Sequence, residues 1–353
     1  MTCELTVRNE LPKDWELLTR DAPVAADRWW IGLGRGRLGT DYRSFTLRED
    51  GTAAVSMGGA VLRTPPGSTR VDPLSVLSGA TASIGLAADE PPPWRGESAE
   101  SVFPCLLLMY PDYASFPVGP RAADGSVLRR FLDEVTRWAT DAGLASVALL
   151  YLVPPAAGAL LEQLPSAGFA VVPLIARCDL EVGWADFEGY LSTLPSKRRV
   201  EARRELRRIE ERGLNLGTRP LAVDEPELLR LRCLQVAKYG AVADPEREHR
   251  YLDLLRGRPA GEVTVFTMQR ADEMLGFSLF VQDRDVWTAA MTGADYRTAD
   301  SSFAYFATLF YQPAALAPAR GVRTIAYGPG SVSAKRRRGC KVTQLWAAGR
   351  ICR

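Results

Sequence analysis

Residues 286–341 determine the fold and read VWTAAMTGADYRTADSSFAYFATLFYQPAALAPARGVRTIAYGPGSVSAKRRRGCK. The opening run is rich in Val, Trp, Thr and Met, which predicts a strand that ends in polar residues. Ser301 or Ser302 is a good N-cap for the helix that follows, with Asp300 beside it, and Gly321 marks the end of that helix. A second strand and a basic turn complete the stretch. Its order is therefore strand, turn, helix, strand, turn, and the helix presents its positive end beyond the first strand.

A similar stretch occurs earlier in the chain. The turn Arg121-Ala-Ala-Asp124-Gly-Ser126 precedes the predicted helix 127–143, and the turn Arg297-Thr-Ala-Asp300-Ser-Ser302 precedes the predicted helix 303–321. An apolar strand follows each helix. Because the shared turn falls at the same place in the same order of elements, we interpret the two stretches as copies of one α/β unit. Residues 121–152 and 297–328 are then equivalent segments.

The length and composition of the chain predict two domains. Its 353 residues, 46% hydrophobic and 24% charged, are enough for two ordinary cores. We place the boundary near Gly183, giving an N-terminal domain of residues 1–183 and a C-terminal domain of residues 184–353. The first is expected to contain a strand at residues 27–34 and a hairpin about Asp50-Gly51. The predicted fold class is α/β (α+β), with two tandem domains that each have a mixed, mostly antiparallel sheet flanked by helices.

Several classes of chemistry are disfavoured by the composition. The net charge is +2, so any attraction for a polyanion must come from a local cluster. The six cysteines are scattered without a C-x-x-C pair, which favours reduced thiols in a cytoplasm and predicts no metal site. No run approaches transmembrane length, so we expect no integral membrane contact. The single histidine, His249, lies in a charged helix, where a solvated surface role is favoured over catalysis.

A basic helix lies near the start of the C-terminal domain, shortly after the boundary at Gly183. Between Lys197 and Arg212 there are eight basic and four acidic residues, a surplus of four positive charges. Most such runs are solvated faces, in which Glu201 would pair with Arg204 and Glu205 with Arg208. The first turn, residues 197–199, concentrates Lys and two Arg where a helix already favours anions. We therefore expect a phosphate or carboxylate ligand there.

These motifs resemble those of a known superfamily. Residues 190–199 (YLSTLPSKRR), 238–240 (KYG) and 327–335 (YGPGSVSAK) are similar to the C-terminal half of the Fem-type aminoacyltransferases, over roughly residues 184–351. Residues 110–116 (YPDYASF) and the order of elements extend the resemblance to the N-terminal half. The resemblance implies two tandem GNAT-like domains, the first degenerate and the second carrying the transfer site.

The sequence departs from the ordinary GNAT pattern at the cofactor loop. GNAT enzymes that use acetyl-CoA carry [Gln/Arg]-x-x-Gly-x-[Gly/Ala] there, because glycines let backbone N–H groups approach the pyrophosphate. Here the turn is 297–302, without those glycines and with Asp300 where pyrophosphate charge would lie. We therefore expect CoA to bind weakly or not at all, and no other cofactor. Arg297 either contacts a donor phosphate or pairs with Asp300.

The Fem-type resemblance implies an aminoacyl-tRNA donor and gives roles to four residues. Lys335 stabilises charge on the oxyanion or on terminal phosphates, unless it belongs to a solvated turn. Tyr296 and Tyr327 end the strands that flank the expected cleft and either relay a proton or pack. Asp295 either holds a substrate amine or caps its own turn. No residue is an obvious nucleophile, which favours direct attack of the acceptor amine on the ester.

Three function classes follow. The first is transfer of an amino acid from aminoacyl-tRNA to an amine or hydroxylamine acceptor, in natural-product or peptidoglycan-precursor biosynthesis. The second is acyl-CoA-dependent N-acyl transfer with a degenerate loop, and the third is a non-catalytic twin-GNAT binding module. The partners expected in the first case are the acceptor end of the tRNA and a small or precursor amine in the cytoplasm. The phosphate-binding residues expected around one mouth of the second half are Lys197, Arg198, Arg199, Lys335 and Lys341.

Overall fold

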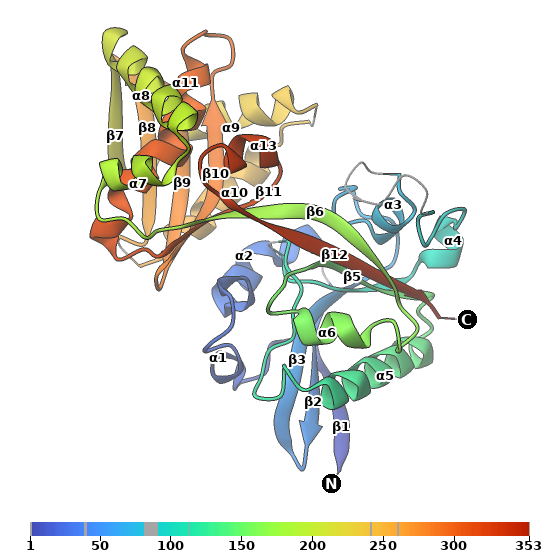
Figure 1. Ribbon diagram of the computed structural model, residues 1–353. Coiled ribbons are helices and arrows are strands. Elements are labelled where there is room, and N and C mark those ends of the chain that lie inside the picture. The colour runs from blue at the N-terminus through green and yellow to red at the C-terminus, as the bar shows by residue number, and fades with distance from the viewer. Residues whose placement is uncertain are drawn as a thin grey trace. The chain divides into compact units, whose positions relative to one another are not determined.

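The chain folds into two compact units. The computed structural model describes residues 2–38, 41–80, 91–111, 113–240, 242–259 and 261–352 (Figure 1). One unit comprises Met1–Ala176 together with Thr343–Arg353, and the other comprises Arg177–Val342. The predicted assignment of residues 343–353 to the second domain is therefore wrong. Strand β12 (Lys341–Ile351) pairs with β5 (Ser146–Leu152) of the first unit. These two strands are far apart in the sequence, so the local sequence pattern does not predict that they pair.

The twelve strands follow one continuous order, and its two six-strand halves have the same strand order and the same pairing. The first contains, in spatial order, β1 (Cys3–Arg8), β2 (Tyr42–Glu49), β3 (Thr52–Leu62), β4 (Cys105–Leu108), β5 and β12. The second contains β7 (Leu214–Pro220), β8 (Val263–Arg270), β9 (Glu273–Asp283), β10 (Val286–Ala294), β11 (Thr324–Pro329) and β6 (Ala170–Glu181). Every neighbouring pair is antiparallel except β4 with β5 and β10 with β11.

The single parallel pair in each unit encloses the repeated turn and helix. In the first unit α5 (Gly125–Asp141) connects β4 to β5, and in the second the helical segment from Ser301 to Arg320 connects β10 to β11. Parallel neighbours require such a crossover connection. The two segments therefore have the same topological setting, and the predicted mixed, mostly antiparallel sheets with flanking helices are confirmed.

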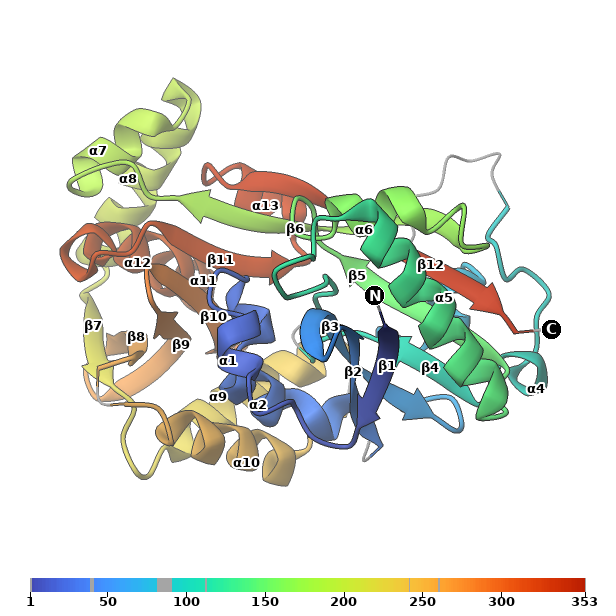
Figure 2. The same cartoon turned by 90° about the horizontal axis from the view of Figure 1, so that it is seen from below.

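In the first unit α5 and α6 lie together, and α5 packs on β1, β3 and β5 (Figures 1 and 2). The face of α5 toward the sheet is apolar at helical spacing, with Leu128, Phe131, Leu132 and Val135 fully buried or nearly so. The described helices of this unit are α1 (Trp15–Leu18), η1 (Val24–Ala26), α2 (Arg28–Leu38), α3 (Pro73–Leu77), α4 (Ala99–Val102), α5 and α6 (Gly158–Gln163).

The second unit has helices on both faces of its sheet. They are α7 (Phe187–Thr193), α8 (Ser196–Glu211), α9 (Pro226–Lys238), α10 (Pro245–Arg256), α11 (Ser301–Phe306), the π-helix η2 (Ala307–Tyr311), α12 (Gln312–Leu316), η3 (Pro318–Arg320) and α13 (Val332–Arg336). In both ribbon views, α9 and α10 lie on one side of β8 and β9, while α7 and α8 lie on the other (Figures 1 and 2).

Two glycines explain how closely helices approach this sheet. A Cβ at Gly293 of β10 would lie 2.7 Å from the backbone carbon of Leu231 in α9. A Cβ at Gly276 of β9 would lie 2.5 Å from the Cβ of Ala304 in α11. Gly276 pairs with Ala294, which points to the face opposite that of Gly293 because side chains alternate along a strand. Thus α9 and α11 cover opposite faces, and both pack on backbone that only glycine leaves accessible.

Three local predictions were wrong. Residues 27–34 begin a helix, α2, because Asp27 accepts a hydrogen bond from the backbone N–H of Trp29 at 2.8 Å and caps it. The apolar runs of residues 169–182 predict a strand pair, but these residues form one long strand, β6. The N-cap before α11 is Asp300 rather than Ser301 or Ser302. The hairpin about Asp50-Gly51 is confirmed, with both residues at positive φ as a type I′ turn requires.

Candidate functional site

The parallel strands β10 and β11 of the second unit diverge after a short paired stretch. Strand β10 pairs with β11 only over Val286–Thr288 and Thr324–Ala326. Beyond that point β10 continues along β9, and the register of β11 on β6 shifts between Ala326 and Pro329. Ligands of α/β proteins commonly bind outside the carboxyl ends of such strands. The turn after β10 and the start of α11 lie at this end.

A cavity of about 410 Å³ lies beside the start of α11, and we name it the α11 cavity. Its volume falls within the range of small-molecule sites. The residues that line it come from the ends of α9 and β10, the first turns of α11 and the loop before α13. They are Lys238, Tyr239, Tyr296, Thr298, Ala299, Ser301, Ser302, Tyr305, Phe306 and Ser331.

The α11 cavity combines one cation with aromatic rings and hydroxyls. The Lys238 ammonium lies 3.4 Å from the centroid of the Tyr296 ring, a cation–π contact. Burial raises the pKa of Tyr296 to about 12, and burial also raises the pKa of Tyr305 against the opposing effect of a hydrogen bond to Ser331. Both phenols therefore stay protonated at neutral pH and act as hydrogen-bond donors. No acidic residue is among the described lining residues.

The hydroxyls of the α11 cavity are not activated nucleophiles. Ser301 donates its hydroxyl proton to the Thr298 carbonyl at 2.8 Å, and Ser302 donates to the Ala299 carbonyl at 2.9 Å. Neither hydroxyl contacts a histidine or carboxylate that would take its proton. This arrangement suits the binding and orientation of two reactants rather than formation of a covalent enzyme intermediate.

Residues 196–336 match the model of the GNAT acetyltransferase domain. They are a GNAT domain. The chain therefore carries an acyltransferase domain, and the α11 cavity lies within it. A search of curated proteins found no match to the sequence.

Solved structures similar to the whole chain include FemX, at 10% identity and a TM-score of 0.59 over 97% of this chain and 96% of that chain. L-PGS from Bacillus licheniformis is similar at 12% identity and a TM-score of 0.53, over 96% of this chain and 91% of that one. A tandem GNAT protein from the clavulanic acid biosynthesis pathway is similar at 9% identity and a TM-score of 0.52, over 100% and 99%. These similarities show that the chain has a tandem GNAT fold.

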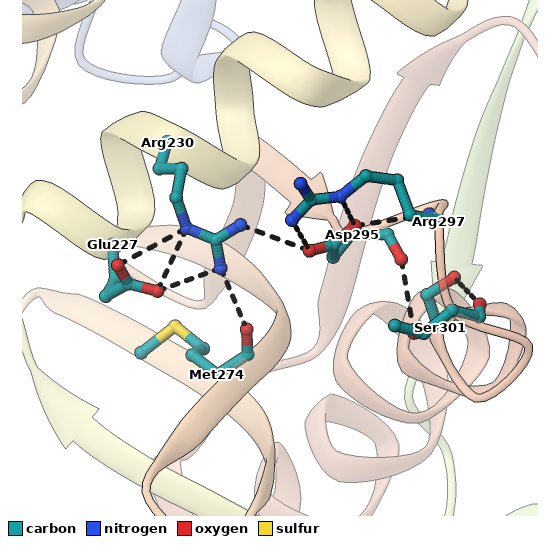
Figure 3. Close-up of polar contacts among 7 residues, drawn as sticks. Glu227, Arg230, Met274, Asp295, Arg297 and Ser301 are labelled. Carbon is teal, nitrogen blue, oxygen red and sulfur yellow. Dashed lines mark hydrogen bonds and ion pairs between the residues drawn. The ribbon is translucent and has the colours of Figure 1, made fainter.

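Asp295, expected to hold a substrate amine or to cap its turn, is a buried anchor in the GNAT domain. Its side chain is 1% exposed and forms ion pairs with Arg230 of α9 at 3.1 Å and with Arg297 (Figure 3). Arg230 also contacts Glu227 at 2.9 Å, and its guanidinium reaches the Met274 carbonyl. Hydrogen bonding by Arg297 holds the pKa of Asp295 well below its usual range. The Asp295 carboxylate and Arg230 together therefore connect α9, β9 and the turn after β10.

Arg297 and Asp300 do not pair with each other, contrary to one expectation. Asp300 is 5% exposed and forms ion pairs with Arg212, at the end of α8, and with Arg270, at the end of β8. Two guanidinium groups thus surround one carboxylate. The negative charge of Asp300, which we expected where pyrophosphate charge would lie, is therefore compensated by these two side chains. Asp300 and Ser302 stand at the two positions where the GNAT cofactor-loop pattern has glycine or alanine.

Lys335 and Tyr327 support the loop that follows β11. The Lys335 side chain is 5% exposed, and its ammonium donates to the carbonyls of Tyr327 at 2.7 Å, Gly328 at 3.0 Å and Pro329 at 3.3 Å. It is therefore buried rather than solvated and is held by these three carbonyls, and burial lowers its pKa. The Tyr327 ring packs on Phe310 at 4.7 Å between centroids. Its buried hydroxyl has no hydrogen-bond partner among the described residues.

The basic residues predicted to gather at one mouth are in different settings. Arg198 pairs with Glu201 at 2.7 Å, and Lys341 pairs with Glu181 at 3.1 Å. Lys197 is exposed, Arg199 is half-buried, and neither forms an ion pair with another described residue. Of the residues predicted for the site, only Tyr296 lines the α11 cavity.

Sequence reasoning missed Lys238, Tyr239, Tyr305 and Ser331 as site residues. Lys238 and Tyr239 stood in a family-like motif at the end of a helix, which was a usable signal. Ser331 lay in the family-like motif of residues 327–335, which was also a usable signal. Tyr305 had no local signal, because its approach to the other lining residues depends on tertiary structure. Ser331 has a φ of 47°, an uncommon conformation for a residue other than glycine.

Proposed function

We propose that this protein transfers an amino acid from aminoacyl-tRNA to an amine acceptor, in natural-product or peptidoglycan-precursor biosynthesis. The observation that carries the proposal is the α11 cavity, in which one ammonium, several aromatic rings and hydroxyls meet without a described acidic residue. The 3′ end of an aminoacyl-tRNA presents a base, a ribose and a phosphate. Aromatic rings stack on bases, and Lys238 supplies a charge for the phosphate. The Fem-type resemblance of residues 184–351 supports the same donor.

The chemistry requires positioning and hydrogen bonding. The acceptor amine attacks the ester carbonyl, a C–N bond forms, and the C–O bond to the ribose breaks. The amine loses a proton and the departing ribose oxygen gains one. A protonated Tyr296 or Tyr305 donates a hydrogen bond to the carbonyl oxygen or to the ribose oxygen as negative charge develops. Direct transfer agrees with the absence of an activated nucleophile among the described residues of the α11 cavity.

The test uses the full-length protein with tRNA pools that each carry one radiolabelled amino acid, and cell extract as the source of amine. Transfer converts the label from a base-labile ester to a base-stable amide, which is counted after mild alkaline treatment. We expect Lys238→Met and Tyr296→Phe to reduce amide formation by about tenfold or more. The matched control Lys13→Met, at an exposed position of the first unit, should leave it unchanged. Amide formation at the wild-type rate in both site variants would show that the α11 cavity is not the transfer site.

Acyl-CoA-dependent transfer is the second candidate, and one observation favours it. Arg212 and Arg270 compensate the charge of Asp300, so the start of α11 does not repel a pyrophosphate electrostatically. Calorimetric titration with CoA and acetyl-CoA separates the two candidates. We expect weak or no binding because the side chains of residues 298–302 obstruct the backbone. A dissociation constant in the low micromolar range, with no amide formed from any aminoacyl-tRNA, would favour acyl-CoA instead.

A further inference from the structure

Helix α8 separates its charges between two faces. The face toward the domain contains Ala202 and Ile209, which are buried, and Leu206. Two of its four acidic residues are paired with other side chains. Glu201 pairs with Arg198, and Glu205 accepts from the buried Arg338 guanidinium at 3.0 and 3.1 Å and from the Tyr311 hydroxyl. The predicted pairs of Glu201 with Arg204 and of Glu205 with Arg208 are therefore absent.

The outward face of α8 is consequently more basic than its sequence indicates. Lys197, Arg204, Arg207 and Arg208 are exposed, and none forms an ion pair with another residue that the structure describes. We call these four residues the α8 stripe. Their neighbour Arg203 pairs with Glu188 at 2.5 Å, and the two remaining acidic residues of the helix are in its last turn. The stripe spans roughly 16 Å along the axis at about 1.5 Å per residue.

Such a stripe favours an extended polyanion over a small ligand. Like charges one turn apart on a helix repel each other, and here no described acidic partner relieves that repulsion. The whole protein has a net charge of only +2, so the attraction would be local. Arginine side chains bind phosphate groups through two parallel hydrogen bonds. A row of phosphates would therefore satisfy several members of the stripe at once.

The residues near the α8 stripe indicate which class of polyanion it would bind. Single strands are bound by stacking on aromatic rings, and the outward face of α8 has none. Helices that lie in a membrane surface insert bulky apolar side chains, but the larger apolar residues of α8 pack inward against α11 and η2, and Val200 alone is exposed. Duplex RNA is recognised mainly by its shape and its phosphate backbone. That chemistry matches the stripe.

We propose that the α8 stripe docks the phosphate backbone of a duplex RNA, the acceptor stem of the donor tRNA. This inference rests on the proposed function, because it names the second contact of the same donor. Helix α8 packs through Ile209 on Ala304 and Ala307, so it covers the helical segment whose first turn lines the α11 cavity. The stripe thus holds the stem, while the cavity takes the esterified end.

The first measurement is binding of a fluorescent acceptor-stem hairpin RNA to the full-length protein across a salt series. The test variant is Lys197→Gln/Arg204→Gln/Arg207→Gln/Arg208→Gln. The control variant Lys13→Gln/Arg63→Gln/Arg137→Gln/Arg250→Gln removes the same four charges from exposed positions elsewhere. We expect the test variant to lose affinity about tenfold or more at about 0.1 M salt and to flatten the log–log salt slope by about three. The control should change affinity less than about twofold. An unchanged affinity and slope in the test variant would overturn the inference.

The second measurement separates this inference from the proposed function. Transfer is assayed with whole aminoacyl-tRNA and with a short aminoacylated CCA oligonucleotide, which lacks the stem. Loss of the stripe should raise KM for the whole tRNA about tenfold and leave the short donor unaffected. If the test variant has the wild-type KM for whole tRNA, the docking inference fails and the proposed function stands. If the wild-type protein binds the hairpin through the stripe but transfers nothing, the proposed function fails and the RNA surface stands.

A membrane surface is tested with vesicles of equal parts phosphatidylglycerol and phosphatidylcholine. We expect no binding that depends on the stripe. If the test variant loses vesicle binding while it keeps its affinity for RNA, the stripe is a lipid surface and the inference is wrong. The circular dichroism and melting temperature of the test variant should match those of the wild type, because all four positions are exposed.

Discussion

Asp295→Asn tests whether this carboxylate is a structural anchor or a substrate contact. The substitution keeps the size of the side chain but removes its charge and turns an amide N–H₂ group toward two guanidinium groups. Breaking a buried ion pair costs about 3–5 kcal/mol. Arg297 is 71% exposed, so solvent screens its ion pair and little stability is lost there, whereas Arg230 is 34% exposed and keeps Glu227. We therefore expect a loss of about 2–3 kcal/mol from the free energy of unfolding.

For a unit of this size that loss lowers the melting temperature by about 4–12 °C. The control Asp133→Asn removes an exposed helical ion pair with Arg129, at 3.1 Å, and should cost less than about 0.5 kcal/mol. Because the folded-state pKa of Asp295 is depressed, its stabilisation is fully present above about pH 4 and is lost as pH falls below it. The difference between wild type and variant should shrink in that acidic range. If Asp295→Asn is as stable as the control and only KM for the amine changes, the anchor interpretation is refuted.

Four further predictions test other contacts. Lys335→Met leaves the carbonyls of residues 327–329 without their donor and should cost about 2–4 kcal/mol in chemical denaturation. Glu205→Gln leaves the buried Arg338 without its counter-ion and should cost about 3 kcal/mol, whereas Glu205→Gln/Arg338→Met should recover part of that loss. With the pKa of Tyr296 near 12, the single-turnover rate should show no decline from tyrosine ionisation between about pH 7 and 10. Asp27→Ala removes the cap of α2 and should cost about 1 kcal/mol, measured by thermal unfolding.

Much of the fold was predictable because local pattern determines it. Strands β8, β9 and β10 alternate or continue apolar residues between clear turns, and α9 follows Pro226 at its first position. The Asp50-Gly51 turn specifies its hairpin because both residues tolerate positive φ. The destination of β12 could not be predicted. An apolar strand is compatible with either sheet, and only pairing with β5 distinguishes them.

The site was less predictable because side-chain partners are chosen by tertiary structure. At helical spacing Glu205 has Arg208 as a neighbour, yet it pairs with Arg338, which lies far along the chain and is 4% exposed. An unpaired cation costs more free energy when it is buried than when it is solvated. Tertiary contacts likewise bury Lys335, whereas Arg204 and Arg208 remain exposed. Charge counts along the sequence therefore do not show which basic residues of α8 are solvated and which are paired.

The two copies of the Arg-x-Ala-Asp turn show why the α11 cavity belongs to the second unit. In the first copy Asp124 accepts from the backbone N–H groups of Ser126 at 2.9 Å and Val127 at 3.2 Å, and Arg121 pairs with it at 2.6 Å. That carboxylate caps α5 and occupies the space beyond its first turn. In the second copy Asp300 makes no capping bond, because Arg212 and Arg270 hold its carboxylate. Thr298, Ala299, Ser301 and Ser302 then line the α11 cavity. In the first copy the aspartate therefore caps the N-terminus of α5, whereas in the second copy the N-terminus of α11 stays accessible to a ligand. The difference follows from which arginine side chains pair with each aspartate.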